Sequence, residues 1–212
     1  TNVITVEGGH NLDQTEHKIL SDHYEIATFL ALGACTGGEI TVHDALPEYF
    51  QPITREFAKF NIHIQYDGNK AIVAKGQQVN LGKNIGHTVL LRPQPWPALP
   101  VDMLPLFVPL ALQAPAGSAL FHNWMYESAL FWTTELLKFG ANITILDPHR
   151  VMAIAGNPLK GATVNAPYII RATVALIMTA LIAEGRSVIT GTDCLDRGHE
   201  NFVSKLKSLG AT

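Results

Sequence analysis

Three charged residues, each at the start of a long apolar run, are the first candidates for chemistry. They are Asp22, Asp102 and Arg171, and each run ends at a glycine turn at a similar distance. An aspartate at the start of a helix caps free amide groups; Asp22 and Asp102 can therefore be caps, which does not exclude contact with a ligand. An arginine there opposes the helix dipole. We therefore expect an anionic partner for Arg171, either a protein carboxylate or a ligand phosphate or carboxylate.

A second arginine, Arg197, lies in the segment Cys194–Gly198, which we expect to lead into a helix at His199. A guanidinium beside the free amides of a helix start is a natural site for an anion. The alternative is a salt bridge with Asp193 or Asp196. The pattern thus indicates an anion-binding site, or local ion pairing, at this turn.

Other motifs predict no further chemistry. The glycine-rich run Gly33–Gly38 lacks a lysine and is typical of a helix end, not of a phosphate loop. The nine histidines follow no metal-ligand spacing, so we expect neither a metal nor a cofactor. Cys35 is expected in a buried helix, and Cys194 follows an aspartate, which disfavours a nucleophilic thiolate. Two cysteines provide no disulfide framework, which favours a reducing compartment such as the cytoplasm.

The elements that position these residues recur three times. Each copy begins with a short apolar segment, continues through an apolar helix-like run and a glycine turn into a strand, and then enters a second helix-like run. The first two copies finish with a hairpin, and the third stops where its hairpin is due. The copies span roughly residues 1–70, 71–150 and 151–212, and their first segments are Ile4–Gly8, Ala71–Gly76 and Val151–Gly156.

Two kinds of helix are predicted in each copy. The first kind is apolar on nearly every face and should be buried; its members are Ile26–Thr36, Met103–Ala114 and Ala172–Ala183. The proline at Pro109 should kink the second of these. The other kind is amphipathic and should lie on a surface. Its apolar stripes are Phe50, Ile53, Phe57 and Phe60, then Trp132, Leu136 and Phe139, then Phe202, Leu206 and Leu209.

The strands are short and bounded by turn residues. They are predicted at Ile40–His43, Ile62–Tyr66, Ala71–Ala74, Val89–Leu91, Ala119–Phe121, Ile143–Leu146, Val151–Ile154 and Val188–Thr190. Each unit then has the order β-α-β-α-β-β, and three units form one α/β domain over residues 1–212, with a core of helices walled by three small sheets. The unfinished third unit should leave an open sheet edge beside Gly210–Thr212, an edge suited to pairing with another chain.

The composition excludes several classes of protein. Apolar residues make up 47% and charged residues 16% of the chain, which excludes disorder. A formal charge of −3 without a basic run disfavours nucleic acid as a partner. The longest apolar stretch, around Ala172–Ala183, is too short to span a membrane. Because the sequence shows neither a signal peptide nor an initiator methionine, we expect it to be an excised or processed segment of a larger protein.

Several segments together resemble a known family. The chain is similar, in order and over nearly all its residues, to the C-terminal half of the UDP-N-acetylglucosamine 1-carboxyvinyltransferases, which are enolpyruvyl transferases. The related enolpyruvylshikimate-phosphate synthases share the three-fold repeat but match these motifs less well. The segments that carry the resemblance are Val6–Gly8, Leu20–Phe29, Pro100–Met103, Thr134–Ala141, Ile182–Gly185 and Asp196–Glu200.

The resemblance implies an inside-out α/β barrel, a second domain of the same kind, and an active site in the cleft between them. It implies phosphoenolpyruvate and a nucleotide sugar as substrates, with a role in peptidoglycan synthesis. Asp102 matches the aspartate that touches the sugar hydroxyl and is the candidate for proton transfer. Arg197 matches an arginine that binds phosphoenolpyruvate, Arg171 another arginine of the cleft, and Met125 a backbone contact to the nucleotide sugar. Asp22 completes the candidate substrate-binding residues.

Two positions depart from the family pattern. Ala129 stands where an arginine is usual, and Ile169 stands where an aspartate is usual two residues before Arg171. The family's catalytic cysteine and lysine lie in the other domain, so the chain alone should be inactive. Three alternatives remain: the usual transferase, a diverged transferase with another nucleotide or a shikimate-like acceptor, and a non-catalytic binding module.

Overall fold

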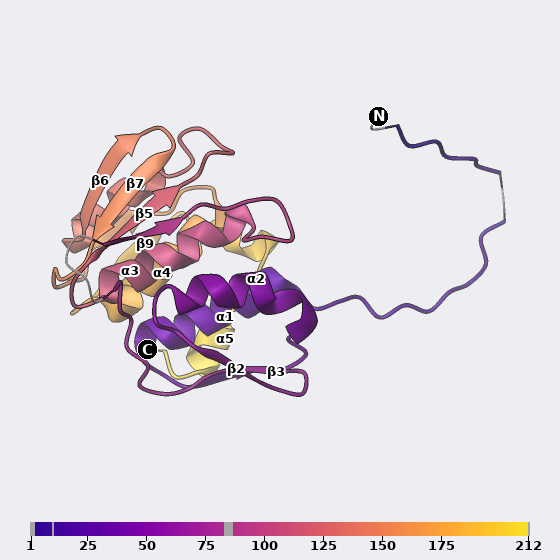
Figure 1. Ribbon diagram of the computed structural model, residues 1–212, viewed down its shortest axis with the longest axis horizontal. Coiled ribbons are helices and arrows are strands. Elements are labelled where there is room, and N and C mark those ends of the chain that lie inside the picture. Colours follow the sequence, from indigo (N-terminus) through magenta and orange to yellow (C-terminus); the bar gives the residue numbers. More distant parts are fainter. Residues whose placement is uncertain (1–2, 10, 83–86, 212) are drawn as a thin grey trace.

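The computed structural model describes residues 3–9, 11–82 and 87–211. Over these residues the chain has an α/β fold in which helices lie between small β-sheets (Figure 1). None of its helices is long and apolar enough to cross a membrane, a finding that concerns only the described residues.

The predicted apolar helices form the centre of the domain. They are α1 (His23–Thr36), η1 (Val101–Leu106) with α3 (Phe107–Gln113), and α4 (Ile170–Ile182). These helices pack against one another (Figure 1). Burial on all sides explains why their sequences are apolar around the whole circumference.

The second of these helices departs from the prediction. It was expected to be one kinked helix from Met103 to Ala114, and it is a 3-10 turn followed by an α-helix that begins at Phe107. Both Pro105 and Pro109 lack an amide proton. The break lies before Phe107, which puts Pro109 in the first turn of α3, where an amide needs no partner within the helix.

The amphipathic helices lie where they were predicted. They are α2 (Pro47–Ala58), the 3-10 helix η2 (Phe131–Phe139) and α5 (Phe202–Ser208). The apolar stripes of the first two are buried in full, which confirms their predicted faces. In the third stripe Phe202 and Leu206 are buried, but Leu209 follows the end of α5 and is 59% exposed, so that part of the prediction is wrong.

Within the described residues the strands form three sheets. The first contains β1 (Ile40–Val42), β3 (Lys70–Val73) and β2 (Ile64–Asp67), all antiparallel. The second has the order β4 (Thr88–Leu91), β5 (Ser118–His122), β7 (Arg150–Ile154), β6 (Asn142–Asp147), in which only the β4–β5 pair is parallel. The third pairs β8 (Thr163–Asn165) with β9 (Val188–Thr190) in parallel. The predicted strands between Ile40 and Thr190 are confirmed, and β8 is an addition.

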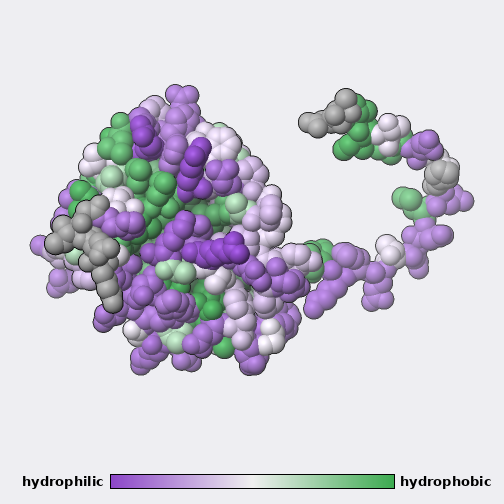
Figure 2. Space-filling model, in the orientation of Figure 1, coloured by the Kyte–Doolittle hydropathy of each residue, from purple (hydrophilic) through white to green (hydrophobic). Residues whose placement is uncertain are grey.

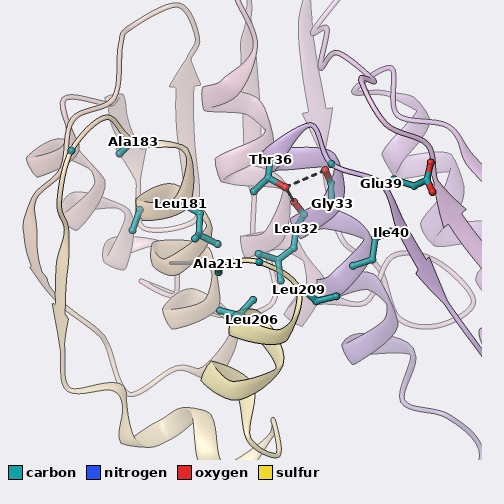
Figure 3. A pocket seen from close by; sticks show the side chains of 14 residues that line it. Leu32, Gly33, Thr36, Glu39, Ile40, Leu181, Ala183, Leu206, Leu209 and Ala211 are labelled. Atoms are coloured by element: carbon teal, nitrogen blue, oxygen red, sulfur yellow. Dashed lines mark hydrogen bonds between the residues drawn. The ribbon is translucent and has the colours of Figure 1, made fainter.

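The third sheet is the smallest, and a groove opens nearby. Within the described part of the chain no further strand pairs with β8 or β9. The open edge predicted beside Gly210–Thr212 stays a prediction, because Thr212 lies outside the described residues. The groove has a volume of about 450 Å³ and is lined by residues of α1, β1, α4 and α5, among them Leu32, Leu181 and Leu206 (Figure 3).

The segment before α1 does not behave as predicted. Ile4–Gly8 was expected to be a strand like its counterparts β3 and β7, but residues 3–9 and 11–20 belong to no helix or strand and are exposed. They extend away from the body (Figure 1), and hydrophobic surface is visible along them (Figure 2). Ile4 and Val6 are among their exposed apolar side chains. A strand needs a neighbour to satisfy its backbone groups, and this segment has none among the described residues.

Candidate functional site

A cavity of about 330 Å³ gathers the charged residues singled out in the sequence. It lies at the first turns of η1 and α4, beside the segment that follows β5 and the end of η3 (Thr192–Arg197). Asp102, Arg171 and Arg197 all line it, although they are far apart in the sequence. The cavity therefore brings one carboxylate and two guanidinium groups to a single concave surface.

Asp102 lies within the first turn of η1 and not at its cap. The cap position is occupied by Pro100, and no side chain bonds to the free amides there. The interpretation of Asp102 as a helix cap is therefore wrong. Its exposed carboxylate lines the cavity, where it is accessible to a ligand. This is the position a proton-transfer group would need.

Asp22 is a helix cap. Its Oδ1 accepts a hydrogen bond of 2.8 Å from the amide of Tyr24, which confirms the cap interpretation for this residue. It is absent from the lining of the cavity. Its Oδ2 lies 3.9 Å from Nη2 of Arg171, so Asp22 forms a long ion pair with the arginine.

Arg171 is the best-supported side chain of the site. Only 12% of it is exposed, and its Nη1 donates a hydrogen bond to Nε2 of His199. Its guanidinium carbon lies 5.3 Å from the centre of the Tyr24 ring. Burial lowers the pKa of Arg171, while Asp22, Asp102, Tyr24 and Glu25 act in the opposite direction. The arginine stays charged, and the expected carboxylate partner exists in Asp22.

Arg197 is held by an aromatic ring. Its guanidinium carbon lies 4.0 Å from the centre of the Tyr168 ring, and its Nη2 donates to the carbonyl oxygen of Tyr168 at 3.4 Å. No ion pair with Asp193 or Asp196 occurs within the described ranges.

The helix predicted to begin two residues after Arg197 starts later. The first residue of α5 is Phe202, and Asn201 at the cap position makes no side-chain bond to the helix amides. The helix amides expected beside Arg197 at His199 are therefore not there. Instead, His199 lies in the turn between η3 and α5, where its amide donates to the carbonyl of Leu195. The anion-binding potential of Arg197 therefore comes from its guanidinium and not from a helix start.

The segment after β5 forms the third side of the cavity. Met125 is half-buried and does not line the cavity, whereas the next residue, Tyr126, does. The amide of Tyr126 donates to Oδ1 of the buried Asn123 at 3.1 Å, which fixes the turn. The structure therefore does not bring Met125 together with Asp102, Arg171 and Arg197 in this cavity.

The two positions that depart from the family pattern meet in the same place. Ala129 and Ile169 both line the cavity, and 45% of Ile169 is exposed. The cavity wall therefore has two apolar residues at the positions where the resemblance led us to expect an arginine and an aspartate.

Three side chains of the site were missed in the sequence. Tyr126 and Tyr168 are isolated aromatic residues without a periodic pattern, and no signal identified them. His199 belongs to the motif Asp196–Glu200, in which only the arginine was predicted to bind a ligand. Over the described residues, no group of three or more histidine, cysteine, aspartate or glutamate side chains is arranged to hold a metal ion.

Comparisons with known proteins identify the family of the chain. The family model for EPSP synthase (3-phosphoshikimate 1-carboxyvinyltransferase) matches residues 1–206. A UDP-N-acetylglucosamine 1-carboxyvinyltransferase of Borreliella burgdorferi is 34% identical over 212 residues, which cover 100% of this chain and 49% of that protein. One from Bacteroides thetaiotaomicron is 34% identical over 215 residues, with the same coverage. The chain thus spans about half the length of these relatives.

Solved structures show the same fold. The enolpyruvyl transferase NikO from Streptomyces tendae superimposes with a TM-score of 0.78 and 17% identity, covering 92% of this chain and 44% of that one. An EPSP synthase from Acinetobacter baumannii gives a TM-score of 0.67 at 16% identity, covering 96% and 49%. Since the family's sequence pattern runs through almost the whole chain, the chain belongs to the EPSP synthase family of enolpyruvyl transferases.

Proposed function

We propose that this chain is one domain of a transferase that moves the enolpyruvyl group of phosphoenolpyruvate to UDP-N-acetylglucosamine, a step of peptidoglycan synthesis in the cytoplasm. The observation that supports this most is the convergence of Asp102, Arg171 and Arg197 on one cavity. The names of the relatives point to the acceptor. The domain is proposed to be an inside-out barrel of three units, the third unfinished.

The chemistry fits these three groups. The acceptor hydroxyl forms a bond to the central carbon of phosphoenolpyruvate and loses its proton, the bond from that carbon to the phosphate oxygen breaks, and phosphate leaves. Arg171 and Arg197 would bind the phosphate and carboxylate charges. Asp102 would exchange the proton with the acceptor hydroxyl or the reacting carbon. We assign Asp22 to the support of Arg171, and Met125 to a backbone contact with the nucleotide sugar.

The residues that line the cavity also suggest that the reaction requires a second domain. Asp102 is the only carboxylate in its lining, and the described lining residues include neither a lysine nor a cysteine. We propose that a second domain of the same kind closes over the cavity and supplies the remaining catalytic groups. The isolated chain is then folded but inactive.

An assay of phosphate release tests this proposal. The 212-residue chain is compared with a protein that also contains the preceding domain, both with phosphoenolpyruvate and UDP-N-acetylglucosamine. We expect turnover from the two-domain protein only. Turnover by the chain alone at a comparable rate would refute the requirement for the second domain, and absence of turnover in both would refute the assigned reaction.

A second candidate rests on Ala129 and Ile169. Because both line the cavity, the apolar wall favours either a different acceptor, such as another nucleotide or a shikimate-like compound, or binding without catalysis. The assay separates these outcomes. A diverged transferase releases phosphate with another acceptor, whereas a binding module releases none with any acceptor.

A further inference from the structure

The hydrogen bond between Arg171 and His199 determines the proton positions on the histidine. Nη1 of Arg171 contacts Nε2 of His199. A guanidinium has only donors, so Nε2 must accept. Its proton therefore lies on Nδ1, and the imidazole is neutral.

The surroundings of His199 keep it in this state. The side chain is only 1% exposed, and its ring packs against the ring of Phe202 with the centroids 4.7 Å apart. The pKa of His199 is lowered to about 4, mainly by burial and next by the positive charge of Arg171. Glu25 and Asp22 act in the opposite direction, and Lys205 acts with Arg171.

The other ring nitrogen faces a carboxylate. Nδ1 of His199 is buried without a hydrogen-bond partner among the described residues, and it lies 4.0 Å from Oε1 of Glu25. That oxygen in turn accepts a bond of 2.7 Å from Nζ of Lys205. An Nδ1–H group directed at a fixed carboxylate favours the same tautomer that the arginine requires.

We propose that His199 is a positioning residue that accepts from Arg171 and holds its guanidinium at the wall of the cavity for an anionic ligand. His199 is not in the lining of the cavity, whereas Arg171 is, so the histidine acts through the arginine. Oδ2 of Asp22 lies 3.9 Å from Nη2 of Arg171, a distance near the upper limit for a salt bridge. His199 is therefore the principal fixed partner of Arg171. The anion itself rests on the proposed function; the tautomer and the hydrogen bond do not.

Nuclear magnetic resonance of the 212-residue chain tests the positioning directly. In the wild type at pH 7 we expect Nε2 of His199 unprotonated, Nδ1 protonated, and the Nη groups of Arg171 in slow rotation. In His199→Phe, which keeps a planar ring but removes the acceptor, that rotation should become fast. A protonated Nε2 in the wild type, or unchanged Arg171 rotation in the variant, would overturn the proposal.

Binding of phosphoenolpyruvate to the same chains measures the consequence. We expect His199→Phe to weaken binding by roughly tenfold, because a charge-assisted hydrogen bond that orients the arginine is lost. His199→Gln, whose carbonyl oxygen reaches the place of Nε2, should restore most of it. Lys207→Gln, an exposed change on α5, is the matched control and should bind like the wild type.

The outcomes separate the two proposals. Equal binding by His199→Phe and the wild type, or equally weak binding by the Phe and Gln variants, would overturn the role of His199. If the wild type binds no phosphoenolpyruvate, the proposed function loses support for the isolated chain, and the rotation of Arg171 still decides the positioning role.

Discussion

The carboxylate of Asp22 serves two helices at once. Its Oδ1 caps α1 through the amide of Tyr24, and its Oδ2 lies 3.9 Å from Nη2 of Arg171 in the first turn of α4. The starts of two buried helices are therefore linked at the wall of the candidate site. Changes at Asp22 should affect both stability and the arginine.

Asparagine and alanine at position 22 separate these two roles. Asparagine caps a helix about as well as aspartate, whereas alanine costs about 1 kcal/mol. We expect Asp22→Ala to lower the free energy of unfolding by about that amount and Asp22→Asn to change it little. Urea unfolding of the three proteins measures the difference, and equal losses in both variants would contradict the cap.

Asp102→Asn tests catalysis with little effect on the fold. Because Asp102 caps no helix and is exposed, the amide should leave the melting temperature unchanged. In the two-domain protein, loss of the proton-transfer group should lower turnover by about 10²–10⁴ fold. Retained turnover would remove Asp102 from the mechanism, and Asp67→Asn, an exposed carboxylate change at the end of β2 outside the cavity lining, serves as the control.

The helices were predicted correctly where the hydrophobic pattern of the sequence matches their burial in the fold. The all-apolar runs became α1, α3 and α4 because only buried helices tolerate apolar residues on every face. The convergence of Asp102, Arg171 and Arg197 on one cavity was also predictable from the repeats and the resemblance together. Asp102 and Arg171 lie near the starts of equivalent helices in two of the repeats.

The failures have physical causes beyond the local pattern. Ile4–Gly8 has the composition of a strand, but a strand forms only where a neighbour satisfies its amides and carbonyls. His199 was missed because its partners are Arg171 and Glu25, which only the packing of α4 and α1 against the turn before α5 brings near. Contacts between remote segments cannot be read from spacing along the chain.

Stability should fall in acid because of His199. The folded-state pKa of about 4 is below the ordinary value of 6.5, so between these pH values the unfolded chain binds a proton that the folded chain does not. The contribution of His199 to the free energy of unfolding is therefore fully present well above pH 6.5, and it falls by up to about 3 kcal/mol towards pH 4. Urea unfolding at pH 7 and pH 4.5 measures this. If the His199→Gln variant loses as much free energy of unfolding between pH 7 and pH 4.5 as the wild type, another group causes the loss.

Gly161 should not tolerate a side chain. A Cβ atom there would lie 2.3 Å from the carbonyl oxygen of Arg186, which is backbone and cannot move aside without disturbing β9. We expect Gly161→Ala to lower the free energy of unfolding by about 1–3 kcal/mol. Gly38→Ala is the matched control, because its Cβ would meet nothing closer than Oγ1 of Thr36 at 3.5 Å. Equal melting temperatures for both variants would contradict the predicted clash.

The last prediction concerns the apolar wall formed by Ala129 and Ile169. Both residues line the cavity with Arg171, so Ala129→Arg with Ile169→Asp would place an opposite pair beside the existing guanidinium. If the missing charges oriented the usual acceptor, the double variant of the two-domain protein should bind UDP-N-acetylglucosamine more tightly. The gain should be about 1.5–3 kcal/mol, the value of a charged hydrogen bond.

Calorimetry on the natural sequence, the two single variants and the double variant decides this. Ala129→Arg alone would place a third positive charge in the cavity, and Ile169→Asp alone would compete with the ligand for Arg171, so neither single change should reproduce the gain. If the acceptor has diverged, the natural sequence should bind UDP-N-acetylglucosamine weakly, because its wall offers methyl groups where a polar acceptor needs partners. Tight binding by the natural sequence, unchanged in the double variant, would reject a diverged acceptor and leave the usual nucleotide sugar as the substrate.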